Sequence, residues 1–145
     1  MIKTQVSQVI DAPLERVWQT IRPFDSLSQW HPFVAACHME NQQANNTIGG
    51  IRAIGLKEGG VVRETLLGLS DTEHRIVYDI IESPMPVENY IASIQLYPVT
   101  ETNQTFVFWD VVFDTPDDQQ QAMIATLQDI FCSGLSQLNE LLAAA

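Results

Sequence analysis

Basic residues are scarce in this sequence. Only 7 of its 145 residues are lysine or arginine, against 18 aspartates and glutamates, which gives a formal net charge of −11. An acidic protein is repelled by phosphate backbones and by anionic lipid surfaces. This charge balance argues against nucleic acid as a partner.

Cysteines and long apolar runs are also lacking. Cys37 and Cys132 are isolated and do not have the spacing of metal ligands, so we expect reduced thiols and no metal site. No phosphate loop, dinucleotide fingerprint or nucleophile triad is present, and we predict no cofactor. No apolar run is long enough to span a membrane, and residues 1–5 do not have the layout of a secretory signal. We therefore expect a cytoplasmic protein without a membrane span.

What the chain does contain is typical of one globular α+β domain covering residues 1–145. Hydrophobic residues make up 46% of the sequence and charged residues 17%, enough apolar material for a real core. The most conspicuous element is a long amphipathic helix predicted from residue 115 to about residue 142. Thr115 is a suitable N-cap, Pro116 suits the first helical position, and apolar residues recur from Met123 onward at helical spacing.

The rest of the chain predicts mainly strands. Residues 2–10 alternate as a strand does, and Pro13 then begins a short helix that Pro23 ends. A second short helix is expected from residue 24 or 25 to about residue 29. Hairpin signals separate six further strands, which we place at about 34–40, 48–56, 61–69, 75–81, 90–97 and 104–113. Short links between consecutive strands favour an antiparallel meander.

The turns also predict which side chains share a face of this sheet. Pairing residue 56 with residue 60 places Arg52 opposite Glu64, and the same register brings Tyr78 and Tyr90 onto that face. We expect this face to meet the last helix. In the final strand we place Trp109 inside, because the opposite choice would bury Asp110.

The Arg52–Glu64 pair is the informative feature of the inner face. Ionised groups in a dry core cost several kcal/mol unless they are paired and hydrogen-bonded. The pair can be structural, or an error of register can leave both residues outside. Alternatively, it forms the polar floor of a pocket that orients a mostly apolar ligand.

His31 is expected beside the opening of such a pocket, between Trp30 and Pro32. A histidine there can act as an acid or base near neutral pH, or it can bind backbone groups and fix a turn. Gly134, in the middle of the predicted long helix, suggests a close approach of another group to that helix.

Several short motifs together resemble the polyketide cyclase/dehydrase-like branch of the START/Bet-v-1-like (SRPBCC) superfamily. Their order and spacing carry the resemblance over almost the whole chain. They are Ile10-Asp11-Ala12-Pro13, Val17-Trp18, Trp30-His31-Pro32, Gly49 to Arg52, Gly60-Val61-Val62-Arg63-Glu64, Tyr78, Pro84-Met85-Pro86-Val87-Glu88-Asn89-Tyr90, Trp109 and the final helix.

The resemblance implies the helix-grip fold, a curved seven-stranded antiparallel sheet around the C-terminal helix with a cavity between them. Members of the superfamily bind lipids, hormones, sterols and polyketides, and only some catalyse cyclisation or dehydration. Carried onto this chain, the family pocket comprises Trp30, His31, Arg52, Glu64, Tyr78, Tyr90 and Trp109. Since the catalytic members use differing polar residues, none of these inherits a defined catalytic role.

Three functions follow as alternatives. The first is binding of a small hydrophobic or aromatic molecule, lipid- or polyketide-like, in the cavity. The second is a cyclase or dehydratase in which Glu64 or His31 is the acid or base. The third is a protein-interaction module of the co-chaperone type. The oligomeric state, monomer or dimer, is left open.

Overall fold

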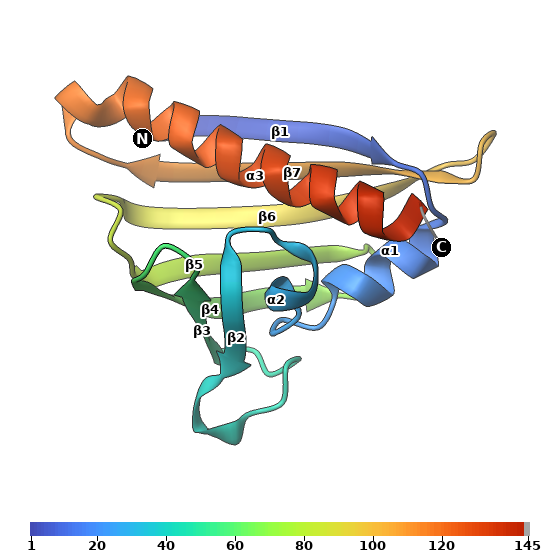
Figure 1. Cartoon of the computed structure of the whole chain (residues 1–145), viewed down its shortest axis with the longest axis horizontal. Helices are drawn as coiled ribbons and strands as arrows, with labels where there is room; N and C mark the ends of the chain where they lie inside the picture. Colours follow the sequence, from blue (N-terminus) through green and yellow to red (C-terminus); the bar gives the residue numbers. More distant parts are fainter. Residues whose placement is uncertain (144–145) are drawn as a thin grey trace.

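Seven antiparallel strands form one sheet in the order β1-β7-β6-β5-β4-β3-β2 (Figure 1). The computed structural model describes residues 1–143, so residues 144 and 145 of the predicted domain lie outside the described residues. The strands are β1 Ile2–Ile10, β2 Val34–Met39, β3 Ile51–Leu56, β4 Val61–Ser70, β5 Arg75–Glu82, β6 Glu88–Val99 and β7 Gln104–Asp114.

The helices lie on one face of this sheet. Helix α1 (Leu14–Ile21) and helix α2 (Leu27–Trp30) follow β1, and α3 (Gln120–Ala143) runs along β1 and β7 on the inner face (Figure 1). Short 3₁₀ turns occupy Glu40–Gln42 and Asp117–Gln119. The predicted α+β helix-grip architecture is confirmed. No helix within residues 1–143 is both long and apolar enough to cross a lipid bilayer.

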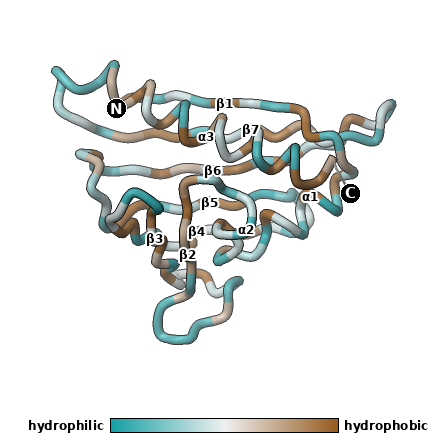
Figure 2. The backbone as a smooth tube through the Cα atoms, in the orientation of Figure 1, coloured by the Kyte–Doolittle hydropathy of each residue, from teal (hydrophilic) through white to brown (hydrophobic). Residues whose placement is uncertain are grey.

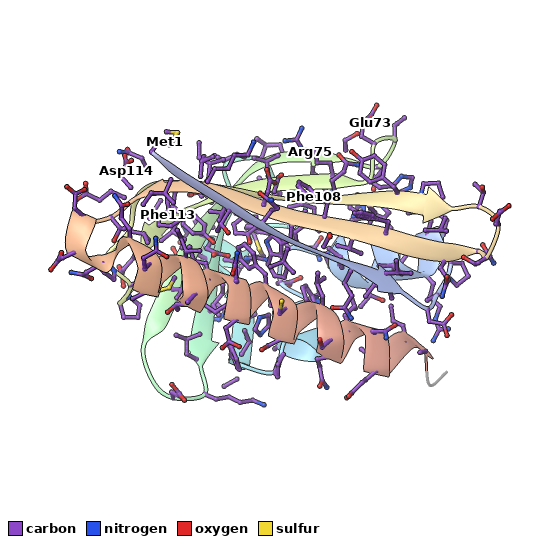
Figure 3. All side chains as sticks on the ribbon, turned by 90° about the horizontal axis from the view of Figure 1, so that it is seen from above. Met1, Glu73, Arg75, Phe108, Phe113 and Asp114 are labelled. Carbon is purple, nitrogen blue, oxygen red and sulfur yellow. The ribbon has the colours of Figure 1, made fainter. Side chains whose placement is uncertain are left out.

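The predicted register is also confirmed. Arg52 pairs with Glu64 across β3 and β4, and Tyr78 pairs with Leu66 on one side and with Ala92 on the other. Hydrophobic and hydrophilic residues alternate along the strands and along α3 (Figure 2). Phe113 lies on the side of the sheet that faces α3, whereas Phe108 lies on the outer side (Figure 3). The inner face and the apolar side of α3 therefore form the core.

The predicted start of the long helix is wrong. The Thr115 hydroxyl donates to the carbonyl oxygen of Pro86 at 2.7 Å, which fastens the end of β7 to the segment that precedes β6. Pro116 has an extended backbone, with φ −55° and ψ 141°. A 3₁₀ turn follows, and α3 begins at Gln120, because Thr115 serves the strand end and not the helix end.

Candidate functional site

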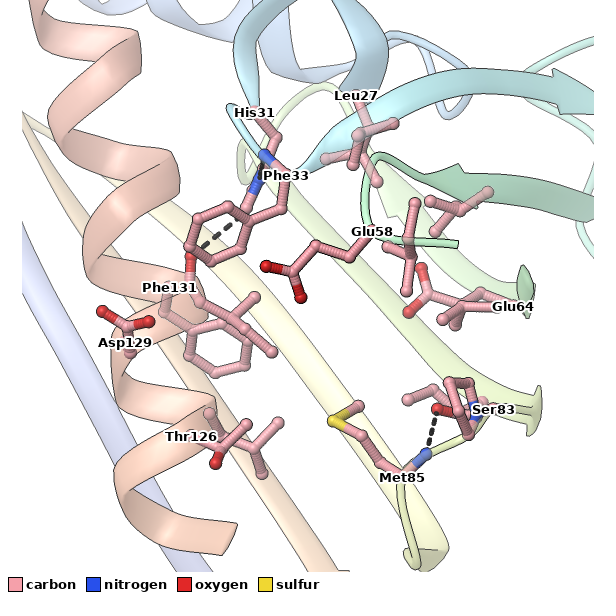
Figure 4. Close-up of a pocket in the computed structure, with 18 of the residues that line it drawn as sticks. Leu27, His31, Phe33, Glu58, Glu64, Ser83, Met85, Thr126, Asp129 and Phe131 are labelled. Carbon is pink, nitrogen blue, oxygen red and sulfur yellow. Dashed lines mark hydrogen bonds between the residues drawn. The ribbon is translucent and has the colours of Figure 1, made fainter. Parts of the chain in front are cut away.

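A cavity of about 720 Å³ lies between the inner face of the sheet and α3. Its walls are mainly apolar side chains from β2 to β7, α2 and α3. At its edge lie the hairpin between β3 and β4, the turn between β5 and β6, and the middle of α3 (Figure 4). The structure therefore leaves space where the sequence predicted a pocket.

The floor of the cavity holds the predicted ion pair. Arg52 Nε donates to Glu64 Oε1 at 2.8 Å, and Arg52 Nη2 lies 2.6 Å from the same oxygen. Both residues are only 6% exposed. Burial raises the pKa of Glu64, and the adjacent Arg52 charge opposes that shift.

Further contacts hold Arg52 in place. Its Nη1 donates to the carbonyl oxygen of Phe24 at 2.8 Å. Its guanidinium carbon lies 3.9 Å from the centre of the Phe24 ring and 4.8 Å from that of Tyr78, within cation–π range. All three guanidinium nitrogens of Arg52 thus have protein partners.

Aromatic residues connect this floor to the helix. Trp109 Nε1 donates to the Tyr78 hydroxyl at 2.9 Å, and the Tyr90 hydroxyl interacts with that of Tyr78. Burial raises the pKa of both tyrosines, so both stay protonated near neutral pH. On its other side Trp109 stacks on Phe131 of α3, with ring centres 4.3 Å apart.

His31 lines the cavity, but backbone groups occupy both of its ring nitrogens. The amide of Phe33 donates to Nδ1 at 3.1 Å, so the proton of the neutral ring is on Nε2. Nε2 then donates to the carbonyl oxygen of Ile130 at 2.9 Å (Figure 4). Burial lowers the pKa of His31, which favours this neutral form. The ring therefore fastens the segment after α2 to α3.

Gly134 is the position on α3 that makes this contact possible. A Cβ there would lie 2.7 Å from Cδ2 of His31 and 3.3 Å from Cζ3 of Trp109. Both distances are shorter than normal van der Waals contact, so a larger residue would displace these rings. The close approach suggested by the sequence is present.

Six of the seven predicted pocket residues line the cavity: His31, Arg52, Glu64, Tyr78, Tyr90 and Trp109. Trp30 is the exception. Its ring centre lies 5.9 Å from that of Trp109, and its Nε1 donates to the Ser26 hydroxyl at 3.2 Å. Trp30 is 2% exposed and supports Trp109 from behind, so its assignment to the cavity wall is corrected.

Sequence reasoning missed the residues around the opening. Lys57 and Glu58 come from the β3–β4 hairpin, Pro84 and Met85 from the β5–β6 turn, and Asp129 from α3. The two loop segments were identified only as turns. Their place at the cavity follows from how the sheet bends around α3, which no local pattern encodes.

A sheet that wraps a long C-terminal helix and encloses a cavity defines the helix-grip class of ligand-binding and catalytic proteins. A family model described as "Polyketide cyclase / dehydrase and lipid transport" matches residues 1–143. The chain belongs to this family.

Known proteins with similar sequences include two receptors from Arabidopsis thaliana. The chain is 29% identical over 113 residues to abscisic acid receptor PYL10 and 29% identical over 112 residues to abscisic acid receptor PYL7. In both cases the match covers 74% of this chain, but only 61% and 52% of the receptors' own lengths.

Solved structures match over nearly the full chain. The protein XoxI from Bacillus cereus aligns with a TM-score of 0.89 at 28% identity, covering 99% of this chain and 96% of that one. A protein from Bacillus thuringiensis aligns with a TM-score of 0.88 at 27% identity, covering 98% and 99% respectively.

Proposed function

We propose that this protein binds a small hydrophobic or aromatic molecule, lipid- or polyketide-like, between the sheet and α3. The observation that carries the proposal is the cavity of about 720 Å³ with its buried polar floor. That volume lies within the roughly 300–1,000 Å³ of small-molecule sites, which are mostly apolar with a few placed polar groups. The family description, with its reference to lipid transport, and the similarity to two abscisic acid receptors support the same conclusion.

The test is a titration with N-phenyl-1-naphthylamine, an uncharged aromatic probe whose fluorescence rises in apolar surroundings. We expect saturable binding of one probe per chain. Ile80 lines the cavity and Ile81, the next residue of β5, is 47% exposed. Ile80→Trp is expected to fill the cavity and abolish binding, while Ile81→Trp makes the same change outside the cavity and is expected to retain it. Equal binding by the two variants would contradict the proposal.

A cyclase or dehydratase is the second candidate, and one observation favours it. Glu64 has a carboxyl group that lines the cavity and a pKa raised by burial, which suits a base that removes a proton beside a carbonyl. His31 is the weaker of the two predicted bases, since its ring nitrogens are bound to backbone groups. Turnover of a poly-β-keto substrate that is lost in Glu64→Gln, while binding persists, would support catalysis.

A further inference from the structure

The hydrogen bonds around the ion pair are unevenly distributed over the Glu64 carboxylate. Both contacts from Arg52 go to Oε1, and no hydrogen bond from a described residue is assigned to Oε2. Within residues 1–143 every fully enclosed side-chain nitrogen or oxygen has a partner, so an oxygen without one has to border open space. The open space beside Glu64 is the cavity (Figure 4). The floor therefore presents an acceptor oxygen to whatever enters.

The guanidinium of Arg52, the cation of the floor, is not free to bind a ligand. The three guanidinium nitrogens of Arg52 bind Glu64 and the Phe24 carbonyl, and the rings of Phe24 and Tyr78 pack against the group. His31 is neutral, and its ring proton is used by Ile130. An anion reaching the floor would find the buried cation of Arg52 already paired.

The opening of the cavity also carries more acidic than basic side chains. Glu58 extends from the β3–β4 hairpin toward the space beside Phe33 and Phe131, and Asp129 lies on α3 near Phe131 (Figure 4). The basic residue among the described lining residues there is Lys57, and Lys57, Glu58 and Asp129 are all exposed. With Glu64 and Arg52 counted, the lining residues carry three acidic side chains and two basic ones.

We propose that the cavity selects molecules that carry a hydrogen-bond donor and no negative charge, and that it rejects anions of similar shape. The O–H or N–H of an alcohol, phenol, aromatic amine or amide donates to Glu64 Oε2 while the apolar body fills the cavity. A carboxylate or sulfonate would add a second negative charge beside Glu64 without a free cation, and an unpaired buried charge is costly. This inference rests on the proposed binding function and narrows its ligand class.

Two probes of nearly the same shape test it. N-phenyl-1-naphthylamine is neutral with one N–H, and 8-anilino-1-naphthalenesulfonate is the same molecule with a sulfonate. We expect the sulfonate to bind the wild-type protein at least about tenfold more weakly, since binding takes it toward carboxylates in a cavity whose buried cation is already paired with Glu64. Failure of both probes to bind would overturn the binding function itself, and the inference with it.

Three Glu→Gln variants, which remove a negative charge at nearly constant side-chain size, test whether charge causes the difference in affinity between the two probes. Glu64→Gln leaves Arg52 without its counter-charge, so the affinity for the sulfonate is expected to rise at least about tenfold relative to the affinity for the neutral probe. Glu58→Gln, an exposed change at the opening, is expected to reduce the ratio of the neutral probe's affinity to the sulfonate's affinity by a smaller factor of roughly two. This variant keeps the test valid if Glu64→Gln does not fold. Glu101→Gln makes the same change in the distant turn between β6 and β7 and should leave the ratio unchanged. Equal binding of the two probes, or a ratio that Glu58→Gln and a folded Glu64→Gln leave unaltered, would overturn the inference while the binding function stands.

Discussion

At the scale of single residues, His31 and Gly134 depend on each other. The imidazole of His31 receives the amide of Phe33 and donates to the carbonyl of Ile130, which fixes the segment after α2 against α3. It can lie there only because Gly134 has no side chain. The sequence predicted both residues as notable, but not their contact, because that depends on where α3 crosses α2.

Gly134→Ala is expected to destabilise the protein although alanine favours a helix. The added Cβ would lie 2.7 Å from His31, an overlap that costs about 1–3 kcal/mol by overpacking against a gain of up to ~1 kcal/mol in helix propensity. We therefore expect a net loss of about 1–2 kcal/mol in the free energy of unfolding, measured with urea. Ser136→Ala, at an exposed position of the same helix, serves as the control and should change stability by less than about 0.5 kcal/mol. A more stable Gly134→Ala protein would show that the contact is wrong.

The burial of His31 leads us to expect that the stability of the protein depends on pH. Its burial lowers the pKa in the folded state below 6.5, so below pH 6.5 the unfolded chain binds more protons than the folded one. The stability present above that pH is therefore lost as the pH falls through 6.5 toward the lowered value.

His31→Gln removes this titrating group. We expect the fall in melting temperature between pH 7.5 and pH 5.5 to be smaller in His31→Gln than in the wild type. His38→Gln changes an exposed histidine of β2 and should leave the wild-type dependence intact. The same pH dependence in all three proteins would contradict a buried neutral His31.

At the scale of elements, α1 is held on the sheet by the turn between β4 and β5. Asp71 in that turn accepts hydrogen bonds from Trp18 Nε1 at 2.9 Å and from Arg22 Nε at 2.5 Å. These bonds, and chiefly the one from Arg22, lower the pKa of Asp71 to about 2. Nothing in the sequence links α1 to this turn, because the two are far apart along the chain.

Acid is expected to weaken this attachment. The pKa of Asp71 falls from 3.8 to about 2 on folding. Its contribution to the stability of the folded protein is therefore present above pH 4 and is lost as the pH drops toward 2. In Asp71→Asn the melting temperature should therefore fall less steeply over that interval than in the wild type. Asp118→Asn, in the 3₁₀ turn before α3, is the matched control. An unaltered profile in Asp71→Asn would show that Asp71 does not hold α1.

The order and register of the strands could be predicted because hairpin turns fix which residues face each other. The pairing of Arg52 with Glu64 followed from the turn after Leu56 in this way. The start of α3 could not be predicted in this way. The Thr115 hydroxyl can bind either the helix N-terminus or another segment, and the sequence does not show that Pro86 is close. Local patterns thus predict the elements, while the ends that contact distant segments need the structure.

At the scale of the whole molecule, the sheet and α3 are separated by a cavity. A buried ion pair, two tyrosines and a tryptophan on the inner face predicted it, since a dry core would contain mainly aliphatic residues. Its volume and its opening follow from how far the sheet bends. That bend arises from many strand pairs together, so the residues of the opening, such as Glu58 and Asp129, could not be identified in advance.

The location of a bound molecule tests the account most directly. With N-phenyl-1-naphthylamine at saturation, intermolecular nuclear Overhauser effects would be measured to the methyl groups of isotope-labelled protein. We predict contacts with Ile54, Met85 and Leu127, which line the cavity. Contacts confined to Leu67 and Ile91, which are exposed on the outer face of the sheet, would contradict the account.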